Sequence, residues 1–133
     1  MAEWTQDLAV GVPKIDAQHQ ELYRQVNKLI DACNEGKGKE AVGEVISFLQ
    51  DYVVQHFQCE EEYMQKYDYP EFAKHKAAHD AFVKSFLDLK ARFEQEGPGI
   101  HIVVLTNRTV VDWLNSHISK TDKALGAFLK TKL

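Results

Sequence analysis

The chain has 133 residues, of which 44% are apolar and 27% are charged. It is therefore long enough to form one domain whose hydrophobic core needs no disulfide. The formal net charge of −4 and the lack of a basic run argue against a nucleic-acid partner. No apolar run approaches the roughly 20 residues of a membrane span, and the polar start of the chain does not resemble a signal peptide. We therefore expect one domain over residues 1–133 and a cytoplasmic location.

The two cysteines, Cys33 and Cys59, form neither a CxxC nor a CxxCH motif, which argues against a redox dithiol or an attached haem. We expect both to be small buried side chains in a reducing compartment. The effect of Cys59, which precedes a candidate metal ligand, is left unassigned.

The first predicted helix carries apolar residues at steps of four and three from Ile15 to Cys33, as a helix facing a bundle does. Pro13 suits its first turn, and Gly36 and Gly38 end it. The short segment before Pro13 contains three apolar residues and is predicted to be an arm that packs on the bundle; these residues are Trp4, Leu8 and Val10.

Three further helices follow with the same periodicity. The second is expected over about 40–66, and Pro70 can open the third, which ends before Gly97. The fourth is expected over about 100–129, where the predicted core-facing residues are Val103, Thr106, Val110, Leu114, His117, Thr121, Ala124 and Phe128. Because the connections are short, neighbouring helices should be antiparallel, so we predict an all-α, up-down-up-down antiparallel four-helix bundle with an N-terminal arm.

Five of the six histidines and two carboxylates form one short cluster on each helix: His19; His56 with Glu60; His75 with His79; and His117 with Asp122. The two pairs spaced by four residues each share one helix face. His117 and Asp122 are five residues apart, about 140° around an ideal helix. Asp122 must therefore reach sideways, or the helix must be locally distorted.

Counting residues from the turns places the four clusters at one depth in the bundle. His19 and His56 lie about 18 and 19 residues on either side of the first turn, or ~27 Å along their helices. His79 and His117 lie about 19 residues on either side of the third turn. Leaving so many buried polar groups unpaired would cost a few kcal/mol each, so the clusters predict a metal centre.

The other polar residues near these clusters receive weaker assignments. His101 lies ~24 Å along the helix from His117 and should be a surface residue. Asp16 is expected either to accept a hydrogen bond from an imidazole ligand or to be a surface acid. Glu61 and Glu62 should face solvent or the edge of a neighbouring helix.

Seven protein ligands are too many for one ion and suit two. Imidazole is a ligand for Fe, Zn, Cu or Ni, and carboxylates can bridge two ions, but four-coordinate zinc would not need so large a set. Two six-coordinate irons need twelve positions. Five imidazoles and two bridging carboxylates fill nine, and one bridging oxo or hydroxo group fills two more. One position then stays open on a single iron, which suits the end-on binding of a small molecule.

The histidine pattern, together with Ile15-Asp16-Ala17-Gln18-His19 and Glu60-Glu61-Glu62-Tyr63-Met64, resembles the hemerythrin family. The resemblance covers nearly the whole chain, and the arrangement looks like a single-domain bacteriohemerythrin. It implies two iron ions with an oxo or hydroxo bridge. The implied ligands are His75, His79 and His117 for one iron, His19 and His56 for the five-coordinate iron that binds O2, and Glu60 and Asp122 as bridges.

The resemblance also implies an oxygen pocket formed by Leu22, Phe57, Trp113, Leu114 and Ile118. Each of these residues could equally be part of the ordinary core. An apolar lining would keep water and protons away from bound O2.

We therefore expect a non-haem di-iron protein that binds O2 reversibly, as an oxygen carrier, storage or delivery protein. It would be a monomer or weak oligomer, with an oxygen-consuming enzyme as a candidate recipient. We expect no enzymatic activity, because no acid–base group beyond the ligands is evident. The alternative is a di-iron enzyme or sensor acting on O2, peroxide or nitric oxide.

Overall fold

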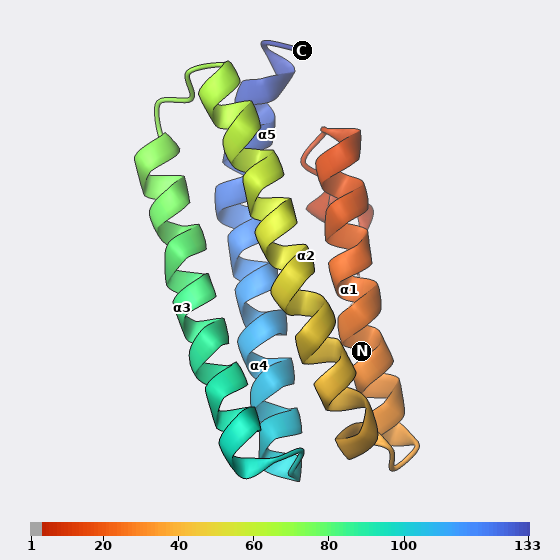
Figure 1. Ribbon diagram of the computed structural model, residues 1–133. Coiled ribbons are helices and arrows are strands. Elements are labelled where there is room, and N and C mark those ends of the chain that lie inside the picture. Colours follow the sequence, from red (N-terminus) through yellow and green to blue (C-terminus); the bar gives the residue numbers. More distant parts are fainter. Residues whose placement is uncertain (1–3) are drawn as a thin grey trace.

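The computed structural model describes residues 4–133, and its regular structure is entirely helical over that range. The four long rods of Figure 1 run side by side and alternate in direction. In chain order the elements are η1 (Gln6–Leu8), α1 (Pro13–Asn34), α2 (Gly38–Lys66), α3 (Phe72–Glu96), α4 (Ile100–His117), the π-helical turn η2 (Ile118–Asp122) and α5 (Lys123–Lys130). The predicted all-α four-helix bundle is confirmed.

The helical periodicity predicted for the first three helices is confirmed. In α1, α2 and α3 the side chains that repeat at steps of three and four are buried, and Cys33, Phe72 and Phe93 at the helix ends are half-buried. Their burial removes apolar surface from water, which is the main contribution to the stability of such a bundle.

Two helix starts differ slightly from the expected ones. Helix α2 begins at Gly38, about two residues early. Pro70 does not open α3 but lies in a turn, in which the backbone N–H of Phe72 donates to the carbonyl of Tyr69. Pro70 has no N–H to donate and tolerates this turn, so the helix starts at Phe72.

The fourth rod is continuous from α4 through η2 to α5 (Figure 1). A π-helical turn contains one residue more than an α-helical turn, so the buried face shifts by one residue after it. The prediction that Thr121, Ala124 and Phe128 continue the core-facing row is wrong: Ala124 is exposed and the other two are only half-buried. The buried residues beyond His117 are Ile118, Asp122, Leu125, Gly126 and Leu129.

The segment before α1 packs on the bundle, as expected for an arm. Trp4 and Leu8 are partly buried against the core, and Val10 is fully buried. The contact with α5 is close, because a Cβ atom on Gly126 would lie 2.0 Å from the carbonyl oxygen of Val10. A glycine at this position lets the arm approach the helix backbone.

Asp16 holds the arm in place instead of contacting a histidine ligand. Its Oδ1 accepts a hydrogen bond of 2.8 Å from the backbone N–H of Val10, and its Oδ2 accepts one of 3.3 Å from that of Gly11. Of the two alternatives expected for Asp16, the hydrogen bond to an imidazole ligand is not seen in the described residues, and the half-buried carboxylate instead accepts from backbone donors of the arm.

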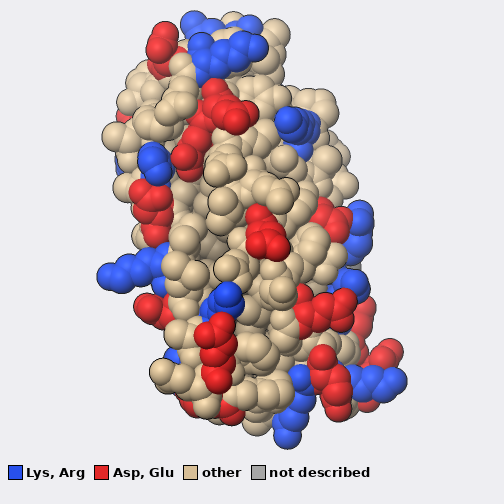
Figure 2. Space-filling model, in the orientation of Figure 1, with Lys and Arg blue, Asp and Glu red and all other residues tan. Residues whose placement is uncertain are grey.

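Between residues 4 and 133, no helix combines the length and the hydropathy that a membrane span requires. Figure 2 shows acidic and basic side chains interspersed over the visible face. This mixture of charges agrees with the argument, made above from the net charge, against a nucleic-acid partner.

Candidate metal centre

The four polar clusters meet inside the bundle, at one level, as the residue counting predicts. His19 comes from α1, His56 and Glu60 from α2, His75 and His79 from α3, His117 from the end of α4 and Asp122 from η2. The exposed fraction of each is between 0% and 5%. Seven polar side chains from all four rods therefore share one water-excluded volume.

Three histidines lie on one side of the two carboxylates. Glu60 Oε1 is 3.0 Å from His79 Nε2 and 3.3 Å from His75 Nε2. Asp122 Oδ1 is 3.1 Å from the Nε2 atoms of both His75 and His117. We call these three histidines, with one oxygen of each carboxylate, the three-histidine half.

The other two histidines face the remaining carboxylate oxygens. Glu60 Oε2 is 3.3 Å from His56 Nε2 and 3.5 Å from His19 Nε2, and Asp122 Oδ2 is 3.0 Å from His19 Nε2. We call this group the two-histidine half. Each carboxylate thus directs one oxygen toward each half, which is the arrangement of a carboxylate that bridges two ions.

The π-helical turn explains how Asp122 reaches the centre. Five residues of an ideal α-helix would place Asp122 about 140° from His117. The wider turn Ile118–Asp122 removes most of this offset, and Asp122 is 1% exposed with Oδ1 beside His117. The local distortion of the helix, one of the two expected alternatives, is the one observed.

Several donor atoms lie close to one another without the geometry of a hydrogen bond. His19 Nε2, His117 Nε2, Glu60 Oε2 and both carboxylate oxygens of Asp122 are buried and have no hydrogen-bond partner within residues 4–133. A buried polar group without a partner costs about 1–3 kcal/mol. The seven side chains divide into two sets that could each hold an ion, and both sets include Glu60 and Asp122. The residues present therefore fit two cations that share two carboxylates.

Without cations, the centre holds its charge in buried ion pairs. Burial lowers the pKa of His19 and His75, but their close contacts with Asp122 and Glu60 outweigh it and raise each pKa to about 9. Burial lowers the pKa of His56 to about 4. Burial tends to raise the pKa of Asp122 and Glu60, yet the surrounding imidazoles hold both well below the usual range.

The residues proposed for an oxygen pocket surround the centre unevenly. Leu22, Phe57, Leu114 and Ile118 are buried, and Trp113 is half-buried. The Phe57 ring stacks on His79 with centroids 3.9 Å apart, and the Trp113 ring stacks on His117 at 4.2 Å. The centroid of Phe57 is 5.8 Å from that of His56. The two aromatic rings therefore lie mainly against the three-histidine half.

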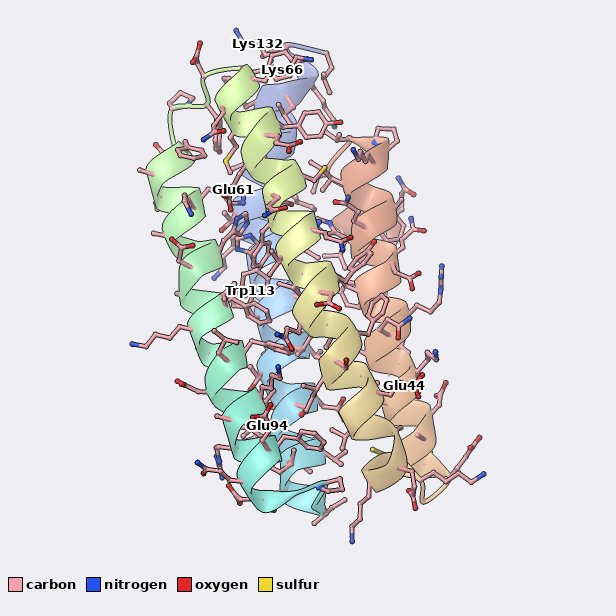
Figure 3. The ribbon with its side chains drawn as sticks, viewed as in Figure 1. Glu44, Glu61, Lys66, Glu94, Trp113 and Lys132 are labelled. Carbon is pink, nitrogen blue, oxygen red and sulfur yellow. The ribbon has the colours of Figure 1, made fainter. Side chains whose placement is uncertain are left out.

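Two polar residues bind the outer nitrogens of the histidines. His56 Nδ1 is 2.7 Å from Gln18 Oε1, and His79 Nδ1 is 3.1 Å from Glu61 Oε2. In Figure 3, Glu61 lies above Trp113. The expectation that Glu61 faces solvent or a helix edge misses this contact. Gln18 is adjacent to His19 in the sequence, which is the signal that could have identified it.

His101 is a surface residue, as expected. Its side chain is 54% exposed, and its Nε2 is 2.6 Å from Glu96 Oε1 near the connection between α3 and α4. Glu62 is exposed, also as expected.

Comparison with known proteins supports the same interpretation. The family model described as "Hemerythrin HHE cation binding domain" matches residues 10–129. The bacteriohemerythrin of Methylococcus capsulatus is 40% identical over 127 residues, which cover 95% of each chain. That of Stenotrophomonas maltophilia is 36% identical over 98% of this chain and 82% of its own. A crystal structure of wild-type hemerythrin superposes with a TM-score of 0.83 at 38% identity over 96% of both chains. The chain belongs to the hemerythrin family.

Proposed function

We propose that this protein binds O2 reversibly at a non-haem di-iron centre formed by His19, His56, Glu60, His75, His79, His117 and Asp122. The observation that carries the proposal is the division of the donor atoms into a three-histidine and a two-histidine half that share both carboxylates. Two iron ions in these halves would supply the electrons that bound O2 takes up and returns.

The inequality of the two halves defines where O2 would bind. Three imidazoles and two carboxylate oxygens give five protein ligands on one side, and two imidazoles and two carboxylate oxygens give four on the other. With a bridging oxo or hydroxo group, an ion held by His19 and His56 would have one protein ligand fewer than its neighbour, which would leave room there for a small molecule.

The chemistry of the donors favours binding over oxidation. Five neutral imidazoles and only two carboxylates surround the ions, whereas ferritin-like sites use mainly glutamates. Fewer anionic ligands stabilise the higher oxidation states of iron less. The centre should therefore release O2 intact and resist permanent oxidation.

The apolar side chains around the centre keep water and protons from it. Leu22, Leu114 and Ile118 are at most 2% exposed, and Phe57 is 4% exposed. A dry lining cannot stabilise a departing anion or deliver a proton to it, so bound O2 would leave as O2. This is the role we propose for these residues and for Trp113.

Visible spectroscopy of iron-loaded protein during cycles of air and anaerobiosis tests the proposal. We expect a charge-transfer band that appears in air, disappears on deoxygenation and returns over several cycles. The surface variant His101→Ala should behave as the unaltered chain does, and His56→Ala should lose the band. Irreversible oxidation on the first exposure to air would contradict oxygen carriage.

A further inference from the structure

The outer ring nitrogens of two histidines, one in each half, have acceptors of different charge. Gln18 Oε1 accepts from His56 Nδ1 at 2.7 Å, and Glu61 Oε2 accepts from His79 Nδ1 at 3.1 Å. A histidine that offers Nε2 to a metal carries its proton on Nδ1, so both rings act as donors outward.

Gln18 presents its carbonyl oxygen to the ring. It comes from α1, one residue before His19, whereas His56 comes from α2, so this contact ties the two helices that form the two-histidine half.

Glu61 is held on two sides. While its Oε2 contacts His79, its Oε1 lies 3.7 Å from the ammonium group of Lys76, which is four residues from Asp80 and within 3.3 Å of it. The side chain of Glu61 is 20% exposed. A carboxylate in this position keeps its negative charge close to the ring.

The outer nitrogens of two other histidines have no such acceptor. The Nδ1 atoms of His19 and His75 are buried without a hydrogen-bond partner in the described part of the chain. Of these four histidines, His56 and His79 are thus the ones with an acceptor at Nδ1. The acceptor is the neutral Gln18 amide in the two-histidine half and the Glu61 carboxylate in the three-histidine half.

We propose that Gln18 and Glu61 are positioning residues that fix the rings of His56 and His79 and make the two halves electronically unequal. This proposal rests on the di-iron function above. A carboxylate acceptor makes an imidazole a stronger donor and stabilises the higher oxidation state of its ion, whereas an amide orients the ring without adding charge. The half with the open position thus receives the neutral acceptor, which favours the return of electrons and the release of O2.

Ring-nitrogen NMR of the protein loaded with Zn(II) alone tests the positioning role without iron chemistry. We expect slowly exchanging Nδ1–H signals from both His56 and His79. Gln18→Leu should abolish slow exchange only at His56, and Glu61→Leu only at His79. In competition with a chelator, each Leu variant should lose about 10- to 100-fold in metal affinity, and Gln18→Glu should restore it.

The reduction potential of the iron-loaded protein tests the electronic role. Gln18→Glu should lower the potential and speed autoxidation, and Glu61→Gln should raise the potential. The matched controls are Gln20→Glu and Glu62→Gln, which make the same charge changes at neighbouring exposed positions.

The outcomes separate this proposal from the function on which it rests. If the unaltered chain takes up neither Zn(II) nor iron, both proposals are wrong. If it binds two irons and cycles with O2 while the Gln18 and Glu61 variants match their controls in potential, affinity and ring N–H exchange, only the present proposal is overturned.

Discussion

The metal-free protein should lose stability as the pH rises from about 7 to 9. In the folded chain the pKa of His19 and of His75 is raised to about 9, since contacts with Asp122 and Glu60 outweigh the opposing effect of burial. In the unfolded chain both imidazoles have a pKa near 6.5. Between pH 6.5 and pH 9, therefore, His19 and His75 each hold a proton in the folded chain that they have lost in the unfolded chain.

The sign and the size follow from proton linkage. A raised folded pKa contributes stability that is fully present below pH 6.5 and is lost as the pH rises through 9. A shift from 6.5 to about 9 corresponds to roughly 3 kcal/mol for each histidine at most, at 1.36 kcal/mol per pKa unit. His56, whose pKa is lowered to about 4 by burial, has the opposite effect below pH 6.5. Between pH 7 and 8 the change therefore comes from His19 and His75, and the buried Cys59 thiol, whose pKa burial raises, adds to the fall only near pH 9.

Urea unfolding followed by circular dichroism at pH 7, 8 and 9 measures this effect. The free energy of unfolding of the metal-free protein should fall by several kcal/mol over this range. Anaerobic loading with Fe(II) should flatten the dependence, because the Nε2 atoms then bind ions in place of protons. His75→Gln should reduce the fall by about half, and the exposed control His101→Gln should leave it unchanged.

A free energy of unfolding that stays constant or rises from pH 7 to 9 in the metal-free protein would refute the reasoning. The same conclusion would follow if His101→Gln changed the slope as much as His75→Gln does.

Three further predictions concern the ligands, the lining and the arm. His117→Ala should lower the iron content well below two per chain by elemental analysis, and full loading would exclude it as a ligand. Leu114→Ala should speed autoxidation by admitting water, so an unchanged rate in air would argue against a protective role. Gly126→Ala should destabilise the protein by about 1–3 kcal/mol in urea, because the new Cβ would displace the buried Val10. Gly43→Ala, for which the nearest atoms belong to the side chain of Phe93 and not to a backbone, is the control, and equal effects of the two substitutions would contradict this role of the arm.

Local patterns were sufficient to predict the bundle and the position of the centre. The rows of buried residues in α1, α2 and α3 follow from a period of 3.6, because only one face of each helix can be removed from water. The depth of His19, His56, His79 and His117 follows from the fixed rise per residue and the short turns. A helical period and a residue count are properties of the chain alone, so these predictions needed no contacts between helices.

Other features depend on partners that are distant in sequence or on departures from ideal geometry. The π-helical turn before Asp122 shifts the buried face of α5 by one residue, and an ideal period cannot anticipate an inserted residue. Asp16 binds the arm, and Glu61 binds His79 from another helix. The sequence alone thus determined which side chains meet and at what depth. Only the tertiary structure decided which carboxylate oxygen faces which half and which polar groups hold the histidines, because these contacts depend on helix rotation and side-chain direction.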